Sequence, residues 1–216
     1  KIKANDKESK VQFETISKIL PLIENGKKIE LNNLKDVESD FVNQLNLISL
    51  KPTMYICNVD EKAILSGNSL SNQVVEFANL NNDSVVLVSA SIEAQIAELE
   101  NELEKAEFLN ELNLDETTLN KVIQSGYNLL NLINYFTCGP KETRSWTIKK
   151  NTLAPQAAGK IHSDFEKGFI RAETVSYRDY VENDGENGSR EAGKLRQEGK
   201  DYVVKDGDVM NFLFNV

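Results

Sequence analysis

Two short and almost continuously apolar segments constrain the fold of this chain more than any other feature. Thr53–Cys57 follows a proline, and Ser84–Val88 has scarcely a polar atom beyond its first residue. A helical pattern over 70–80 separates them, and apolar strands joined through a helix are typical of a parallel sheet covered on both faces. Two strands are too few for a whole sheet of this kind, so the sequence predicts about half of an α/β domain.

Amphipathic patterns predict helices on both sides of these strands. Residues 7–25 carry an apolar stripe that ends in an Asn-Gly pair, and 36–47 predicts a second helix. A first helix with no partner before it suggests that its partner lies outside this sequence. One long helix is expected over 92–108, with its glutamates as a solvated flank, and another over 115–126, capped by its aspartate.

The pattern of apolar and polar residues changes near residue 131, and a small α+β domain of the β-grasp kind is predicted from there on. The polar stretch 181–193 is expected to be an excursion between strands, because strand-like sequence resumes beyond it. The expected elements are a hairpin, a helix, a single strand, a short helix and a second hairpin. The hairpins are expected over 133–137 with 143–149 and 202–204 with 209–214, the first helix over 155–166 and the single strand over 169–177.

Charge and composition limit what the chain can bind. The net charge of −9 arises upstream of residue 131, because the remaining segment carries 13 basic and 13 acidic side chains. This balance argues against coating nucleic acid through bulk electrostatics, and we expect no DNA binding, although a neutral module can contact RNA through a local patch. No apolar run could span a membrane and no targeting pattern opens the chain, so we expect a cytoplasmic monomer. Cys57 and Cys138 lack a CxxC pattern, which favours free thiols over a metal site.

Polar residues follow both apolar segments at the points where the strands should end. The first segment runs into Asn58-Val59-Asp60-Glu61 and the second into Ser89-Ala90-Ser91. Ligands of open parallel sheets bind at the carboxyl ends of strands, and in GTP-binding domains these ends carry Asn-Lys-x-Asp and a Ser-Ala turn that read the base. Taken alone, the tetrapeptide favours an ordinary strand-to-loop turn. Together with Ser89-Ala90 at the second strand end, it favours recognition of a nucleotide base. The predicted nucleotide-binding residues are Asn58, Val59, Glu61, Ser89, Ala90 and Ser91.

Two of these positions depart from the guanine-reading pattern. A carboxylate suits guanine because its ring N–H and exocyclic amine are both donors, whereas adenine presents neither at that edge. Here Glu61 is one methylene longer than aspartate, and Val59 stands at the lysine position. An unpaired buried partner costs about 1–3 kcal/mol, which is enough to remove much of a preference for one base.

These residues, and longer runs near the end of the chain, resemble the YchF and Obg-like ATPase family. Asn58-Val59-Asp60-Glu61 resembles the Asn-x-x-Glu variant of that family, which uses ATP in preference to GTP. Four further runs resemble its TGS domain nearly residue for residue: NYFTCG at 134–139, RSWTI at 144–148, APQAAGKIHSDFEKGFIRAE at 154–173 and GKDYVVKDGDVM at 199–210.

The resemblance covers essentially the whole chain and implies a C-terminal part of such a protein. It implies the returning arm of a helical insertion over 1–33, the second part of a P-loop NTPase domain over 34–130 and a TGS domain over 131–216. It further implies a switch protein that binds ATP, or GTP as the second candidate, with Mg²⁺ in the full-length parent. The large ribosomal subunit or ribosomal RNA is the implied partner.

The family's phosphate loop, which would precede the insertion, is missing from this sequence. Residues 188–194 match Gly-x4-Gly-Lys in spacing only, because Leu195 stands where Mg²⁺ needs a hydroxyl and no apolar strand precedes the motif. We therefore expect no catalytic residues in this chain and no ATP hydrolysis by it alone. Two alternatives stay open: an RNA- or ribosome-binding module without nucleotide function, and a TGS appendage of a tRNA synthetase or alarmone enzyme, although such appendages lack the Asn58–Glu61 motif.

Single residues of the last segment favour structural roles. His162, the only histidine, has no nucleophile placed beside it in sequence, so a surface or structural role is expected. Tyr135, Phe136 and Trp146 could stack on RNA bases, but aromatic side chains of a small domain are more often core, and a core role is predicted.

Overall fold

The structure is a computed structural model that describes residues 6–215, and it divides into two compact units, Lys1–Thr53 and Met54–Val216. The boundary falls within the predicted 34–130 segment. Each unit is described here by itself.

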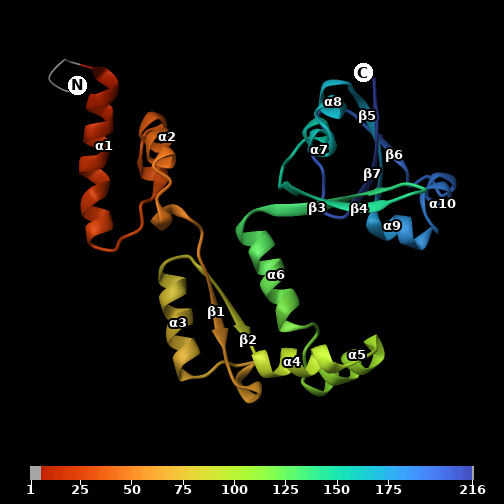
Figure 1. Ribbon diagram of the computed structural model, residues 1–216, viewed down its shortest axis with the longest axis horizontal. Coiled ribbons are helices and arrows are strands. Elements are labelled where there is room, and N and C mark those ends of the chain that lie inside the picture. Colours follow the sequence, from red (N-terminus) through yellow and green to blue (C-terminus); the bar gives the residue numbers. More distant parts are fainter. Residues whose placement is uncertain (1–5, 216) are drawn as a thin grey trace. The chain divides into compact units, whose positions relative to one another are not determined.

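The first unit is a pair of helices, α1 (Lys7–Glu24) and α2 (Asp36–Gln44), which lie side by side (Figure 1). Short 3-10 turns at Leu31–Asn33 and Ile48–Leu50 complete it. Both predicted helices are confirmed, although α2 ends three residues before the predicted 47. The buried residues are Ile19, Ile29 and Val42, and the ammonium of Lys18 pairs with the carboxylate of Glu38 across the two helices.

The second unit opens with the predicted parallel strand pair. Strand β1 (Met54–Asn58) runs beside β2 (Ser84–Val88) in parallel, with α3 (Ser69–Leu80) as the crossover and a 3-10 turn at Glu61–Ala63. The register pairs Met54 with Ser84 and Asn58 with Val88, so both strands end at the same edge. The prediction of a parallel sheet is therefore confirmed.

The long helix predicted over 92–108 is wrong. Two helices replace it, α4 (Ala90–Glu98) and α5 (Glu102–Glu111), because Leu99 takes an extended conformation and Asn101 caps the second helix by accepting the N–H of Glu104 at 2.8 Å. A side chain that satisfies an orphan N–H favours a new helix start over continuation. The next helix, α6 (Thr118–Leu129), begins later than predicted, with Thr117 rather than Asp115 as its cap.

The rest of the unit is a five-stranded sheet in the order β4-β3-β7-β5-β6. Neighbouring strands are antiparallel except β3 and β7, which are parallel. Its elements are β3 (Leu132–Cys138), β4 (Thr143–Lys149), α7 (Ala154–Ile161), α8 (Ser163–Lys167), β5 (Phe169–Ser176), α9 (Tyr177–Glu182), α10 (Glu186–Glu191), β6 (Arg196–Glu198) and β7 (Asp208–Phe214).

The first predicted hairpin is confirmed as β3 and β4, but the second is wrong. Strand β7 has β5 on one side and β3 on the other, so neither edge is open to residues 202–204. Val203 instead forms a bridge with Leu153, and the N–H of Val204 donates to the carbonyl of Thr152 at 3.0 Å. The loop before β7 is thereby fastened to the end of β4.

One further expectation for this part is corrected. The helix predicted over 155–166 breaks at His162, whose backbone is extended and whose Nδ1 accepts the N–H of Asp164 at 3.2 Å. His162 therefore has the structural role predicted for it, as a helix cap. The polar excursion 181–193 lies between strands as predicted. It contains the end of α9 and the whole of α10, where one short helix was expected.

The core of the five-stranded sheet lies between the strands and α7. Tyr135 is fully buried, and its hydroxyl donates to the carbonyl of Ala157 at 2.8 Å, so the predicted core role of this residue is confirmed. Trp146 is half-buried against the core, and its Nε1 donates to Thr137 at 2.9 Å. Phe136 is half-buried too and packs against Tyr177 on the other face of the sheet.

No helix within residues 6–215 has the length and apolar content needed to cross a membrane.

Candidate functional site

The two polar strand ends predicted to bind a nucleotide lie next to each other. Asn58 closes β1, and its Oδ1 accepts the backbone N–H of Ala90 at 3.0 Å, across 32 residues of sequence. Ala90 is the first residue of α4, directly after β2. The structure therefore brings the Asn58 side chain and the Ser89–Ser91 turn together at one edge of the parallel pair. Because the Asn58 oxygen is engaged, its NH₂ group remains as the donor toward a ligand.

Val59 and Ser89 form the buried floor of this edge. Val59 is 8% exposed, and its side chain belongs to a cluster with Ile64, Ile92 and Ile96. Its N–H donates to the carbonyl of Val88 at 2.8 Å. A base at this edge could therefore meet only the backbone carbonyl of Val59. Ser89 is fully buried, and its hydroxyl lies 3.0 Å from that of exposed Ser91.

Glu61 lies on the rim of the same edge, in the short turn after β1. Its carboxylate accepts a hydrogen bond from Nε2 of Gln95 at 2.9 Å, and both side chains are exposed. No sequence pattern pointed to Gln95, because it lies 34 residues away on α4. This contact holds the carboxylate against α4 and leaves three of its lone-pair directions for solvent or ligand.

A second tie behind the edge was also missed by sequence reasoning. Glu93 on α4 accepts the N–H and hydroxyl of Thr118 at 2.7 and 2.6 Å, and the N–H of Leu119 at 3.2 Å. A carboxylate at a helix N-terminus satisfies orphan N–H groups and complements the helix dipole. Glu93 therefore couples the helix that starts at the strand edge to α6.

The motif rejected as a phosphate loop is not a loop. Residues 188–191 lie within α10, and Lys194 pairs with Asp179 at 3.2 Å. No strand precedes that helix directly, because α9 comes before it. In the part of the chain from 6 to 215, no group of three or more His, Cys, Asp or Glu side chains could hold a metal ion.

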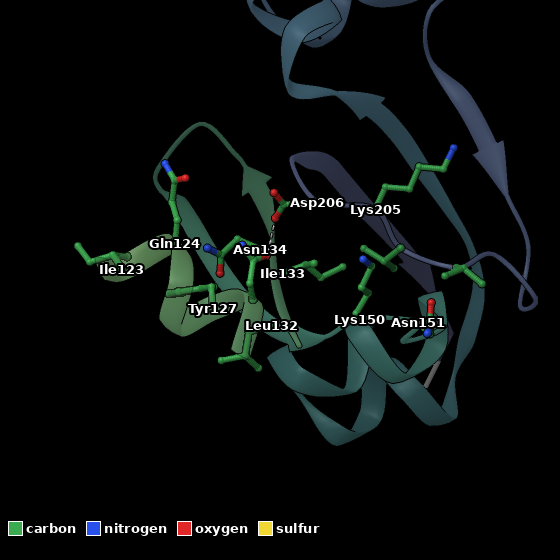
Figure 2. A pocket seen from close by; sticks show the side chains of 13 residues that line it. Ile123, Gln124, Tyr127, Leu132, Ile133, Asn134, Lys150, Asn151, Lys205 and Asp206 are labelled. Atoms are coloured by element: carbon green, nitrogen blue, oxygen red, sulfur yellow. Dashed lines mark hydrogen bonds between the residues drawn. The ribbon is translucent and has the colours of Figure 1, made fainter. Parts of the chain in front are cut away.

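A separate cleft of about 760 Å³ lies between α6 and one end of the five-stranded sheet (Figure 2). Three segments line it: the outward side of α6, the start of β3 with the turn after β4, and the loop before β7. Figure 2 shows Tyr127 and Gln124 from α6 on one side and Lys150 and Asn151 on the other. No sequence pattern pointed to this cleft, because its walls come from segments up to about 80 residues apart.

Comparison with known proteins identifies the family. The family model YchF-GTPase_C, described as "Protein of unknown function (DUF933)", matches residues 132–215. The chain is 52% identical over 216 residues to "Ribosome-binding ATPase YchF" of Escherichia coli O157:H7, with 100% of this chain and 59% of that protein covered. The protein of the same name from Bacillus subtilis is 47% identical over 216 residues, with 99% of this chain and 59% of that protein covered.

Solved structures agree with these relatives. The Schizosaccharomyces pombe YchF GTPase aligns with a TM-score of 0.76 and 35% identity, covering 93% of this chain and 53% of that one. A GTP-binding protein from Pyrococcus horikoshii OT3, at 18% identity and a TM-score of 0.54, shares the fold. The chain spans less than two thirds of the length of these relatives. With about half of its residues identical to such relatives along its whole length, the chain belongs to the YchF family.

Proposed function

We propose that this chain is the C-terminal part of a longer protein that binds and hydrolyses ATP and associates with the ribosome in the cytoplasm. The names of the relatives and the share of their length that this chain covers support this reading. In such a switch, contacts to the γ-phosphate order mobile segments and hydrolysis releases them. The phosphates and Mg²⁺ would be held by residues outside this chain. An intact mass of the protein from its source tests the proposed length.

The proposed parts follow the boundaries predicted from sequence. Residues 1–33 would form the returning arm of a helical insertion, 34–130 the second part of the nucleotide-binding domain, and 131–216 a TGS domain that binds the large ribosomal subunit or its RNA. The strand order β4-β3-β7-β5-β6, with β3 and β7 parallel, supports the last assignment because it is the order of a β-grasp fold.

The hydrogen bond between Asn58 and Ala90 is the observation that carries the nucleotide proposal. It fixes the Asn58 amide so that its NH₂ can donate to N7 of a purine, an acceptor that adenine and guanine share. Asn58 would therefore bind either purine, and the choice between them falls to the Val59 carbonyl, Glu61 and the Ser89–Ser91 turn. The Val59 carbonyl can accept from the adenine amine, which supports ATP as the preferred nucleotide.

Asn58→Asp in the full-length protein separates the two functions of this side chain. Aspartate can still accept the Ala90 N–H, so the edge should keep its structure, but it cannot donate to N7. We expect ATP and GTP binding to weaken together by about tenfold or more, since a lost hydrogen-bond partner costs about 1–3 kcal/mol. Asn79→Asp on the exposed end of α3 makes the same chemical change away from the edge and should leave both affinities unchanged.

The same titration distinguishes the rival reading of a binding module without nucleotide function. That reading expects no saturable binding of either nucleotide to the full-length protein. Unchanged affinities in Asn58→Asp, with binding intact in the parent, would show that the nucleotide binds but that its base does not lie at this edge.

A further inference from the structure

The cleft between α6 and the five-stranded sheet has the size and lining of a ligand site. Its volume of about 760 Å³ lies within the range of about 300–1,000 Å³ typical of small-molecule sites. Apolar and polar groups share its walls, among them Ile123, Ile133 and Val204 and also Tyr127, Lys150 and Asp206. A ligand that fits would have an apolar or ring part and a polar end.

The charges of the lining select an anion. Lys150 and Lys205 are its cations and Asp206 its one carboxylate, in a chain whose net charge is −9. Within residues 6–215, neither lysine has an ion-pair partner, and the ion pairs around the nearby sheet are made by other basic side chains. One oxygen of Asp206 is occupied by the N–H of Asn134 at 2.8 Å. A cleft lined by positive side chains raises the local concentration of anions, even where the net charge of the protein is negative.

The two lysines differ in how they face the cleft. In Figure 2 the ammonium of Lys150 lies near the middle of the labelled side chains, whereas Lys205 extends away from them. Lys150 is therefore placed to bind an anionic group inside the cleft. Lys205 can reach the same group only by swinging its flexible stem, so its contribution should be smaller.

A fixed aromatic ring forms the wall that α6 contributes. The hydroxyl of Tyr127 lies 3.5 Å from that of Thr147, which in turn donates to Oδ1 of Asn134 at 2.8 Å. This chain of polar contacts orients a half-buried ring against β3 and β4. A flat side chain in a set orientation favours a planar ring as ligand, since stacking prefers parallel, offset rings.

Backbone hydrogen bonds hold the walls in place before any ligand arrives. The N–H of Lys150 donates to the carbonyl of Asn131 at 2.7 Å, and the N–H of Gly207 donates to that of Asn134 at 2.8 Å. The loop before β7 is also fastened to Thr152 through Val204. A site that is already formed loses little free energy to ordering when it binds.

We propose that this cleft binds a nucleotide monophosphate unit, with the phosphate at Lys150 and the ring against Tyr127. The unit can be a free nucleotide or the 5′-phosphorylated end of an RNA strand, which offer the same chemistry. The site is separate from the purine edge at Asn58 and does not depend on it.

A titration of the isotope-labelled full-length protein with cytidine 5′-monophosphate tests the proposal. A pyrimidine probe avoids the purine edge, so failure here leaves the proposed ATP site untouched. We expect amide signals of Asn134, Lys150 and Lys205 to shift at millimolar probe. Inorganic phosphate should shift the lysines more weakly, because it lacks the ring.

Matched variants assign the two contacts. Lys150→Gln should weaken binding about tenfold, since it removes a charge-assisted hydrogen bond, and Lys205→Gln should weaken it less. Lys160→Gln, at an exposed position of α7, makes the same charge change outside the cleft and should have no effect. Tyr127→Leu should weaken nucleotide binding about fivefold or more while leaving phosphate binding unchanged.

A 5′-phosphorylated oligocytidylate distinguishes the sources of the ligand. Tighter binding of the oligonucleotide at the same amides identifies an RNA end, and binding of the free nucleotide alone identifies a small metabolite. The proposal is overturned if neither probe shifts the cleft amides, or if Lys150→Gln and Lys160→Gln have the same effect.

Discussion

Glu93→Ala is the substitution whose cost follows most directly from the geometry. Its carboxylate satisfies two groups of Thr118 and one of Leu119 at the first turn of α6. Thr118 is 1% exposed, so water cannot replace the lost acceptor without opening the contact between α4 and α6. The substitution therefore leaves a buried N–H and a buried hydroxyl without their partner.

Each buried polar group left unsatisfied costs about 1–3 kcal/mol. Two such groups predict that the free energy of unfolding falls by about 2–6 kcal/mol in Glu93→Ala. Glu93→Gln keeps an oxygen acceptor and loses the charge, so it should cost about 1–2 kcal/mol. Glu98→Ala, at an exposed position near the end of the same helix, should cost less than about 0.5 kcal/mol.

Urea unfolding followed by circular dichroism at a helix-sensitive wavelength measures these differences. Hydrogen exchange of the Thr118 and Leu119 amides adds a local readout, because both should exchange faster in Glu93→Ala than in Glu98→Ala. Equal unfolding midpoints for Glu93→Ala and Glu98→Ala would refute the reasoning and would mean that the α6 terminus is stabilised by something else.

Three other outcomes are expected. Trp146→Ala should lower the free energy of unfolding by about 2–4 kcal/mol, because a half-buried ring and its bond to Thr137 are lost; an unchanged melting temperature with weaker RNA binding would instead favour a stacking role. Because the ammonium of Lys18 donates to it, Glu38 has a pKa below its ordinary 4.5, so the helix pair of the first unit should be weakened as pH falls through that lowered pKa. Circular dichroism should show this acid step reduced in Glu38→Gln. Purified chain should release no phosphate from Mg²⁺-ATP; release abolished by Lys194→Ala would contradict this.

The parallel strand pair could be predicted because its signature is local. A strand covered on both faces is apolar at almost every position, and β2 shows this in the four consecutive residues Val85–Val88. The polar residues at the two strand ends then follow from where the apolar runs stop. For the same reason, the hydrogen bond between Asn58 and Ala90 joins residues that the sequence had already placed together.

Features decided by competition between distant segments could not be predicted. Val203 and Val204 have the pattern of a hairpin strand, but β3 and β5 occupy the two edges of β7. The local sequence around 202–214 cannot show which distant strands will pair with β7. The long amphipathic pattern over 92–108 likewise concealed a break, because one capping side chain, Asn101, outweighs several apolar positions of correct spacing. The cleft could not be predicted from the sequence, because its three walls come together only in the folded chain.

The measurement that most directly tests the purine edge is an isotope-edited NOE experiment on the full-length protein with bound ATP. Our account predicts NOEs from adenine H8, the proton next to N7, to side-chain protons of Asn58 and to Ala90 or Ser91. With one molar equivalent of ATP, it predicts no NOEs from the adenine to Tyr127 or Lys150. NOEs from the adenine to the cleft residues, with none to Asn58 or Ala90, would contradict it.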